Sequence, residues 1–331
     1  MDALYEVSVH WFFNNGDSGS TYGCRSRSIM RTCIFILYIN LVATHAALTP
    51  ELYWKSMLPT APIPKSIAVL LRTPGKGSTV HSGFVSSKSV GYPVNEYMYG
   101  YHRCCESKLQ NKPDTAIFFL ENNLKSGHKM KLLFEKTSIQ ASFLPSEVVK
   151  SIPFSSTKIA EILNKFAVKP GSIKADVMKN TIKLCEESEI KGEDKYCATS
   201  LEAMLDFIIM KLGKNVEALS TEVMKKETKK QEYTITNGVK KEGGTKVMVC
   251  HKLDYVYAVF YCHKIENSVT YTVSLEGADG SRVKAVSVCH RDTSKWNPKH
   301  LAFQMLNVKP GSVPICHFLF QDTIAWVPKQ N

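Results

Sequence analysis

Four short stretches of the chain place a histidine directly after a cysteine: VMVCHK at residues 247–252, AVFYCHK at 258–264, VSVCHR at 286–291 and VPICHF at 313–318. Each stretch is rich in β-branched, apolar or aromatic residues, which is typical of a buried strand. Ten residues separate the first two pairs, and twenty-five residues separate each later pair from the one before it. A dipeptide of two uncommon residue types that recurs with this spacing indicates a shared role.

The position of each pair within a strand predicts where its two side chains point. Successive side chains of a strand face opposite sides of the sheet, so a cysteine and the histidine after it lie on different faces. We therefore expect the four sulfurs to share one face and to form disulfides, each worth about 2–4 kcal/mol. The opposite face then carries a polar cluster of four imidazoles, namely His251, His263, His290 and His317.

The predicted histidine cluster has two interpretations. Neutral imidazole is a ligand that suits copper or zinc once the thiols are consumed in disulfides. The alternative is a set of hydrogen-bonded histidines without a metal. A structural zinc centre that takes both members of a pair conflicts with their opposite orientation, and the spacing lacks the paired Cys-x-x-Cys of zinc ribbons.

The composition indicates a folded chain with a strong positive charge. Of the 331 residues, 44% are hydrophobic and 22% are charged, which is typical of globular proteins. Because 42 Lys and Arg residues outnumber 30 Asp and Glu residues, the formal net charge is +12, which favours a polyanionic partner. The sequence has no Gly-x-Ser-x-Gly, His-Glu-x-x-His or phosphate-binding loop motif, which argues against the common hydrolase classes.

A secretory signal peptide is predicted at residues 30–46. Arg31 supplies the positive charge, residues 33–43 are apolar, and Ala46 suits the small-residue pattern before a cleavage site. Eleven apolar residues are too few to span the roughly 30 Å hydrocarbon core of a bilayer, so we expect no transmembrane segment. Residues 1–29 are interpreted as an over-extended start.

Secretion narrows the partners and supports disulfides. Cleavage after Ala46 leaves eight cysteines, which permit 105 connectivities, so the pairing stays open. An oxidising compartment favours disulfides. Outside the cell, nucleic acid is excluded as the partner for the positive charge, and an acidic polysaccharide such as pectin is expected instead.

The remaining sequence divides into a flexible segment and a folded domain. Residues 47–114 are rich in Pro, Ser, Gly and Lys and are predicted to be a flexible N-terminal segment, and the folded domain begins at residue 115. Three helices are predicted: one capped by Ser156, one near residues 173–185, and one from the capping box of Thr199 and Glu202 to Gly213. Strands are predicted at residues 245–251, 255–263, 268–275, 282–290, 301–308, 314–320 and 323–327.

These elements predict an α+β fold, with a helical N-terminal part of the domain followed by a largely antiparallel, β-rich C-terminal half stabilised by disulfides. The phrase VKPGS occurs at residues 168–172 and 308–312 and is interpreted as a reused turn. A lysine-rich run at residues 223–244 is interpreted as a solvated face or loop, with polyanion binding as the alternative. Its clusters are Lys225, Lys226, Lys229, Lys230, Lys240 and Lys241.

Several longer stretches resemble a known plant family. The pattern CH-x10-CH-x25-CH-x25-CH occurs together with FFLENNLKSGHKM at residues 118–130, EIKGEDKYCATSLEAM at 189–204 and CHRDTSKWNPKHLAFQMLNVKPGSVPICHFL at 289–319. These stretches closely resemble the plant BURP domain over about residues 115–328. The resemblance implies a plant protein of the secretory pathway, located in the cell wall or apoplast or in the storage vacuole.

The resemblance also implies two kinds of function. Many members are wall or seed proteins linked to development or to drought and salt stress, without assigned chemistry. For such a protein the positive charge makes pectin or a wall protein the expected partner. Other members are copper-dependent peptide cyclases, which crosslink Tyr or Trp side chains of a core peptide. The candidate copper ligands are then His251, His263, His290, His317 and His300. The candidate disulfide cysteines are Cys185, Cys197, Cys250, Cys262, Cys289 and Cys316.

The segment before the domain lacks a typical core peptide of a fused cyclase. Fused cyclases typically carry core peptides that begin with Gln and contain Trp or Tyr, but Gln110 is the only glutamine before residue 118 and no Trp or Tyr follows it there. Tyr97, Tyr99 and Tyr101 could supply phenols, although a tyrosine-rich linker is the simpler interpretation. We therefore expect a non-catalytic protein, with a cyclase, acting on its own chain or on a separate peptide, as the alternative.

Overall fold

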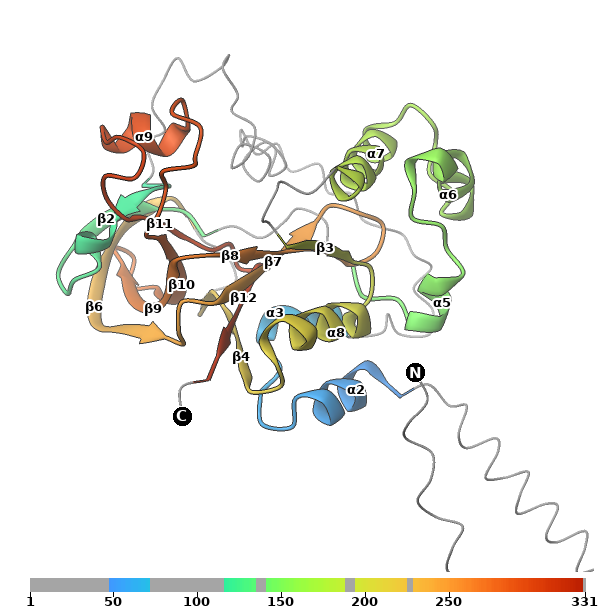
Figure 1. The fold of residues 1–331 in the computed structure, drawn as a ribbon, viewed down its shortest axis with the longest axis horizontal. Coiled ribbons are helices and arrows are strands. Elements are labelled where there is room, and N and C mark those ends of the chain that lie inside the picture. Colours follow the sequence, from blue (N-terminus) through green and yellow to red (C-terminus); the bar gives the residue numbers. More distant parts are fainter. Residues whose placement is uncertain (1–47, 72–115, 135–140, 188–193, 225–228, 330–331) are drawn as a thin grey trace, which may run out of the picture. The chain divides into compact units, whose positions relative to one another are not determined.

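The computed structural model describes residues 48–71, 116–134, 141–187, 194–224 and 229–329 (Figure 1). Residues 48–331 form one compact unit. The predicted signal peptide at residues 30–46 and the stretch at 1–29 lie outside the described residues. Among the described residues, no helix combines the length and the apolar content needed to cross a membrane.

Two antiparallel sheets form the centre of the unit. The larger sheet has seven strands in the order β1-β11-β10-β9-β6-β2, with β5 paired to β10, and the smaller sheet has five in the order β3-β8-β7-β12-β4. The larger sheet consists of β1 (Phe119–Leu120), β2 (Lys129–Leu132), β5 (Glu222–Val223), β6 (Gln231–Glu242), β9 (Ser268–Gly277), β10 (Arg282–His290) and β11 (Ile315–Phe318). The smaller sheet consists of β3 (Lys195–Ala198), β4 (Val216–Ser220), β7 (Val247–Leu253), β8 (Val259–Ile265) and β12 (Ile324–Pro328).

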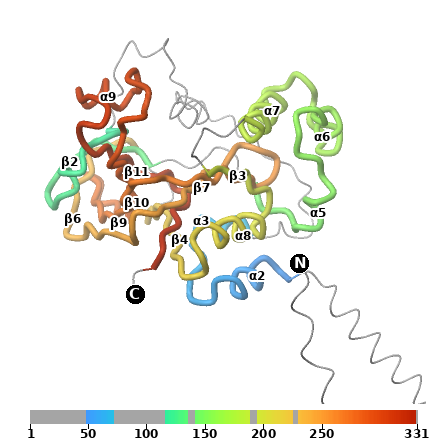
Figure 2. Tube along the Cα trace, in the orientation of Figure 1, coloured from blue at the N-terminus to red at the C-terminus, as the bar shows by residue number. Residues whose placement is uncertain are grey.

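Helices cover the outer parts of this arrangement (Figure 2). They are α2 (Pro50–Met57), α3 (Lys65–Leu70), η1 (Glu121–Asn123), α5 (Ser146–Lys150), η2 (Ser156–Lys158), α6 (Ile159–Lys165), α7 (Ile173–Glu186), α8 (Leu201–Leu212) and α9 (Leu301–Leu306). The helices α2, α3 and α8 pack on one face of the smaller sheet, where Leu205 and Ile208 meet Met248 and Phe260. The helices α6 and α7 pack against the segment that leads into β8.

The two sheets face each other through a shared apolar core. Val247 and Val249 of β7 lie in one cluster with Val286 and Val288 of β10, and all four side chains are almost fully buried. Each sheet therefore has an inner face toward the other sheet and an outer face. This distinction decides where the cysteines and histidines of the four pairs lie.

The fold class agrees with the sequence prediction. Helices combine with antiparallel sheets, the C-terminal half is β-rich, and three disulfides are present. The order is more mixed than predicted, since β1 and β2 precede the helices of the domain and β3 lies between α7 and α8. The two VKPGS stretches form the same turn. The backbone N–H of Ser172 donates to the carbonyl of Lys169, and that of Ser312 donates to the carbonyl of Lys309.

Residues 48–71 depart from the predicted flexible segment. They form α2 and α3, and Trp54, Leu58 and Ile67 are each at most 1% exposed. The ring centroids of Trp54 and of Trp326 in β12 are 5.6 Å apart, and the indole N–H of Trp54 donates to the carbonyl of Ala61. Prolines separate the two short helices, so the sequence shows no sustained helical period. Residues 72–114 of the predicted segment lie outside the described residues.

Other local predictions also need correction. Residues 301–308 were predicted as a strand but contain the helix α9, which His300 caps and which ends at Asn307 in the left-handed conformation. Apolar density alone does not distinguish a short buried helix from a strand. Within the lysine-rich run, residues 231–242 form the strand β6 rather than a loop, although Lys240 and Lys241 are exposed as a solvated face requires. The strand β8 begins at Val259, later than predicted. Ser155 caps the 3-10 turn η2 that leads into α6, and Ser200 caps α8, each one residue from the predicted position, whereas the N-cap of α6 itself is Lys158.

Candidate functional site: two disulfide-linked strand pairs with facing histidines

The six candidate cysteines form three disulfides among the described residues. Cys250 bonds to Cys262 and Cys289 bonds to Cys316, and in both cases the two cysteines are directly opposite each other on neighbouring antiparallel strands. The Cα atoms are 3.9 Å apart in each pair. Cys185 at the end of α7 bonds to Cys197 in β3. Sequence reasoning named the cysteines but could not assign these pairings.

The prediction that the four motif sulfurs share one face is wrong. Cys250 and Cys262 lie on the outer face of the smaller sheet, in the apolar cluster with α8. Cys289 and Cys316 lie on the outer face of the larger sheet, in the cluster with Phe119 and Phe134. The prediction assumed a single sheet, whereas the motif strands divide equally between two. The alternation within each strand holds, so each histidine is on the inner side of its own sheet.

Each disulfide places two imidazoles side by side on the opposite face. The Nε2 atoms of His251 and His263 are 3.3 Å apart, and their rings stack at 5.4 Å between centroids. The Nε2 atoms of His290 and His317 are also 3.3 Å apart, with ring centroids at 5.5 Å. The same local sequence therefore builds the same geometry twice, because each register sets two histidines diagonally across one strand pair.

The buried position of His317 sets its protonation. Burial lowers the pKa of His317 to about 4, and the nearby imidazoles of His263 and His300 add to the shift, while the Phe318 carbonyl opposes it. The pKa of His317 therefore depends on His263, a histidine of the other sheet, as well as on groups near it in its own sheet. A neutral imidazole at ordinary pH is the form that can ligate a metal.

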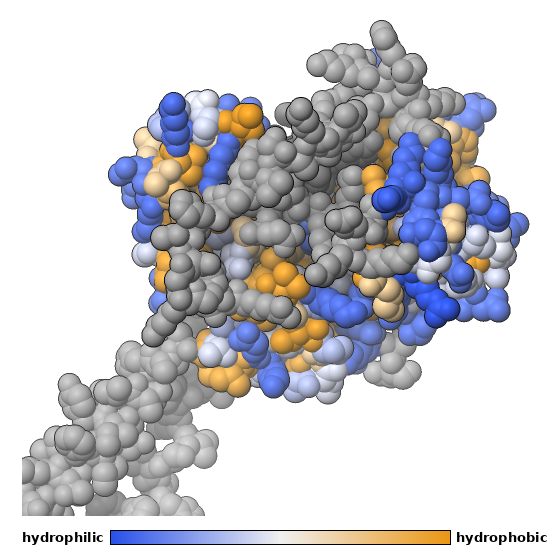
Figure 3. Space-filling view, turned by 180° about the vertical axis from the view of Figure 1, so that it is seen from behind, coloured by the Kyte–Doolittle hydropathy of each residue, from blue (hydrophilic) through white to orange (hydrophobic). Residues whose placement is uncertain are grey.

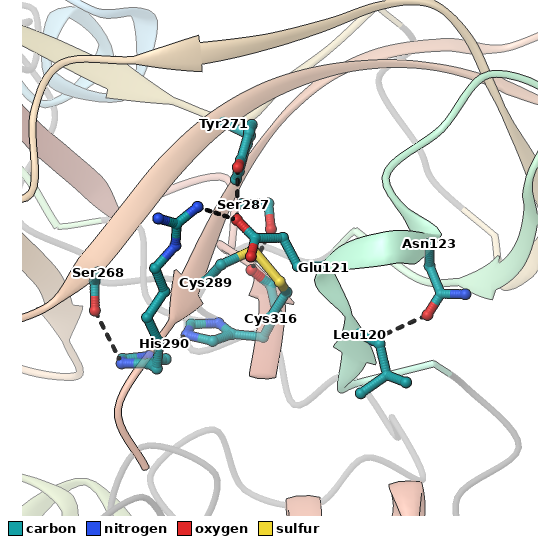
Figure 4. The surroundings of a disulfide bond; sticks show 11 residues. Leu120, Glu121, Asn123, Ser268, Tyr271, Ser287, Cys289, His290 and Cys316 are labelled. Carbon is teal, nitrogen blue, oxygen red and sulfur yellow. Dashed lines mark hydrogen bonds and ion pairs between the residues drawn. A yellow bond between two sulfur atoms is a disulfide. The ribbon is translucent and has the colours of Figure 1, made fainter. Parts of the chain in front are cut away.

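The two histidines of the larger sheet each have a partner for Nδ1, and Figure 4 shows the one between Ser268 and His290. Ser268 donates its hydroxyl proton to the carbonyl of Glu266, so its oxygen accepts from Nδ1 of His290 at 3.4 Å. The carbonyl of Phe318, 3.4 Å from Nδ1 of His317, can only accept. In the neutral tautomer that these two contacts favour, each ring carries its proton on Nδ1 and keeps a lone pair on Nε2. These two lone pairs face each other, an arrangement that a shared proton or a metal cation would stabilise.

The spacing of the pairs also suits two ligands of one metal ion. Two imidazole nitrogens bound at about 2.0–2.1 Å with tetrahedral angles lie about 3.3 Å apart, as the Nε2 atoms do in each pair. Within the described ranges, however, no group of three or more His, Cys, Asp or Glu side chains is arranged to hold a metal ion. Each pair therefore fits part of a metal site.

His300 occupies a different role from the other four. It is the N-cap of α9, and its Nδ1 accepts a hydrogen bond from the backbone N–H of Ala302 at 3.2 Å. In the neutral ring the proton is then on Nε2, so ligation by Nε2 requires the cap bond to be given up. His300 lies beside the pairs as a buried neighbour rather than as a preformed ligand.

Aromatic side chains enclose the histidines. Trp296 lies 4.9 Å from His290 and 4.7 Å from His300, measured between ring centroids. Phe118 lies 5.6 Å from His300 and 6.3 Å from His317. Sequence reasoning missed Trp296, Phe118 and Ser268 as parts of the site. The only signal was that the first two stand within the family-like stretches.

An ion pair joins the turn η1, which follows Phe118 and β1, to the neighbouring strands of the larger sheet. One carboxylate oxygen of Glu121 accepts hydrogen bonds from the hydroxyl of Tyr271 at 2.6 Å and from Arg291 at 3.0 Å (Figure 4). Although burial acts in the opposite direction, these hydrogen bonds hold the pKa of Glu121 below its usual range. The contact ties η1 and β1 to β9 and to the residue after His290.

Comparison with known proteins identifies the family. The model of the BURP domain matches residues 117–328, so the chain belongs to the BURP domain family. It is 43% identical over 294 residues to BURP domain-containing protein 5 of Oryza sativa subsp. japonica, covering 86% of this chain and 88% of that protein. It is 47% identical over 253 residues to BURP domain protein RD22 of Arabidopsis thaliana, covering 75% of this chain.

The relatives differ in length. BURP domain-containing protein 3 of Oryza sativa subsp. japonica is 46% identical over 243 residues, which cover 72% of this chain. The matches span 64% of RD22 and 56% of BURP domain-containing protein 3. All three relatives are plant proteins, in agreement with the resemblance read from the sequence.

Proposed function

We propose that the chain is a secreted plant protein of the cell wall or apoplast, or of the storage vacuole, with a non-catalytic role in development or in the response to drought and salt. The observation that carries this proposal is the consumption of six cysteines in three disulfides, two of which crosslink neighbouring strands. Disulfides persist in oxidising compartments and are rare in the cytosol. The predicted signal peptide at residues 30–46 supports the same location.

Secretion is tested by the mature N-terminus. Protein recovered from plant extracellular fluid or from vacuoles should begin at Ala47 or close to it. A cytosolic protein that retains Met1 would contradict the proposal. The free-thiol count of the same preparation should be the count expected when the disulfides of Cys185, Cys250 and Cys289 are all formed.

The proposed partner is an acidic polysaccharide such as pectin, or a wall protein that presents similar charge. The net charge of +12 supports it, as do hydrophilic side chains spread over much of the described surface in Figure 3, between smaller apolar areas. Lys229 and Lys241 are exposed, whereas Lys240 already pairs with Glu242 at 2.7 Å. Lys225 and Lys226 lie outside the described residues.

Retention on immobilised de-esterified pectin tests this partner. Binding should weaken as salt rises toward about 1 M, where the screening length is about 3 Å. A neutral polysaccharide is the control and should retain nothing. The double variant Lys229→Ala/Lys241→Ala should elute at lower salt than Lys169→Ala, which removes an exposed lysine from another part of the surface. Retention independent of salt would contradict the electrostatic mode.

The alternative function is a copper-dependent peptide cyclase, which the facing Nε2 atoms favour. The residues that would hold copper are His251 with His263 and His290 with His317. Copper, when bound, would supply one-electron oxidation of a Tyr or Trp side chain of the peptide. Ser268 would keep the Nε2 lone pair of His290 directed at the ion, and the aromatic neighbours of the site would limit access of water.

Mass spectrometry separates the two functions. A copper-loaded preparation, supplied with oxygen and a peptide that contains Tyr or Trp, should leave the peptide mass unchanged if the protein is non-catalytic. A product lighter by two hydrogens, formed by the wild type but not by His290→Ala, would establish the cyclase in place of the non-catalytic role. The variant Lys264→Ala, outside the two pairs, is the control for nonspecific oxidation.

A further inference from the structure

Residues 48–71 bind to the rest of the unit mainly through a continuous apolar surface. Trp54 and Leu58 of the α2 region are each 1% exposed, and Ile67 of α3 is fully buried. They pack in the same cluster as Leu205 of α8 and Trp326 of β12. These contacts join parts of the chain that are more than a hundred residues apart, so they belong to tertiary structure and not to a local turn.

Polar contacts fix both helices of the segment on this surface. The hydroxyl of Tyr53 donates to the carboxylate of Asp206 at 2.5 Å. The ammonium of Lys329 donates to the carbonyl of Thr60 at 2.9 Å, and Lys65 pairs with Glu222 at 2.7 Å. The backbone N–H of Phe143 also donates to the carbonyl of Leu70. The segment is therefore oriented at several points along its length.

None of these contacts requires residues 72–115 to be intact. We propose that residues 48–71 are a separable ligand of the folded domain, so that a chain cut within residues 72–115 stays assembled as a two-piece protein. The anchors are the buried side chains of α2 and α3 and the receiving surface is that of α8 and β12. Cleavage removes the high effective concentration that the covalent connection provides.

This inference is independent of the proposed function and has a consequence for processing. A plant protease that cuts within residues 72–115 would divide the chain without removing the segment that completes the core. Loss of the segment itself would expose Trp326 and the part of the outer face of the smaller sheet that α8 does not cover. The mature protein that results from cleavage within residues 72–115 would consist of two chains.

The first experiment uses the full chain with one specific protease site introduced within residues 72–115. After complete cleavage, size-exclusion chromatography without denaturant should give one peak that contains both pieces. In urea the pieces should separate, and removal of urea should restore the single peak. Separation of the pieces without denaturant would overturn the proposal.

The second experiment places the variants in a peptide, so that folding of the domain is not at issue. A labelled peptide of residues 48–71 should exchange into the cleaved protein in competition with the resident piece. A peptide with Trp54→Ala should bind at least about a hundredfold more weakly, since truncation of a buried Trp costs about 3–5 kcal/mol. A peptide with Leu52→Ala is the matched control, because Leu52 lies on the same helix and is 51% exposed. Equal binding of the two variant peptides would overturn the assigned surface.

Discussion

Removal of the Cys289–Cys316 disulfide should destabilise the protein more than removal of either other disulfide. The two cysteines are 27 residues apart, so the loop-closure relation gives about 3.6 kcal/mol for the entropy that the bond removes from the unfolded chain. The separation is 12 residues for Cys250–Cys262 and for Cys185–Cys197, which gives about 2.8 kcal/mol for each. The expected order therefore follows the length of the closed loop.

The perturbation is the double variant Cys289→Ala/Cys316→Ala, compared with Cys250→Ala/Cys262→Ala and Cys185→Ala/Cys197→Ala. Both cysteines change together, so that no free thiol remains to exchange with another disulfide. The first two variants are closely matched, because all four cysteines are fully buried and each bond links directly opposite residues of an antiparallel pair. The difference between them then reports the loop length.

Urea unfolding under oxidising conditions measures the effect. The free energy of unfolding should fall by about 3.6 kcal/mol for the first variant and by about 2.8 kcal/mol for the other two, with similar m-values. A loss below about 1 kcal/mol for the Cys289 variant would refute the reasoning. So would a larger loss for the Cys250 variant, because native packing rather than the unfolded chain would then control stability.

Further predictions concern pH and the enclosure of the histidines. The pKa of His317 is about 4 in the folded protein and about 6.5 in the unfolded chain. The resulting contribution to the free energy of unfolding, about 3 kcal/mol, should therefore be present above pH 6.5 and lost as pH falls toward 4. The variant His317→Gln should reduce the dependence of stability on pH in this range. Phe118→Ala should raise the pKa of His317 in an NMR titration, since burial is the main cause of the shift, and an unchanged pKa would contradict that cause. Burial raises the pKa of Tyr257 to about 12, so stability should fall between pH 10 and 12, and Tyr257→Phe should reduce this fall. At neutral pH the same variant should cost little, because the Tyr257 hydroxyl is buried without a hydrogen-bond partner among the described residues.

The sequence was most informative where local periodicity and chemistry coincide. The strand β10 spans the predicted residues 282–290, and α7 begins at the predicted Ile173, because alternation and helical spacing are both set within a few residues. The separation of sulfur from imidazole followed from the same alternation. These features need no knowledge of which strands are neighbours.

The features that sequence reasoning missed depend on contacts between distant residues. The division of the four motif strands between two sheets comes from the pairing of β12 with β7 and of β10 with β9, which alternation does not specify. The docking of Trp54 depends on Trp326, far away in the sequence. His300 was grouped with the candidate ligands because it matches a position of the family, but its cap bond to Ala302 appears only once α9 is known to be a helix.

The central claim is that each disulfide-linked strand pair directs its sulfurs and its imidazoles to opposite faces. The most direct test is a titration with Cu(II), followed by electron paramagnetic resonance and by a free-thiol count on the same samples. His290→Ala should reduce copper binding and leave the thiol count at the wild-type value. Cys289→Ala should release one thiol, that of Cys316, and cost about 2–5 kcal/mol of stability. A free-thiol count that rises in His290→Ala would contradict the separation of sulfurs from imidazoles, and copper binding that is absent in the wild type, or unchanged in His290→Ala, would remove the copper-dependent alternative.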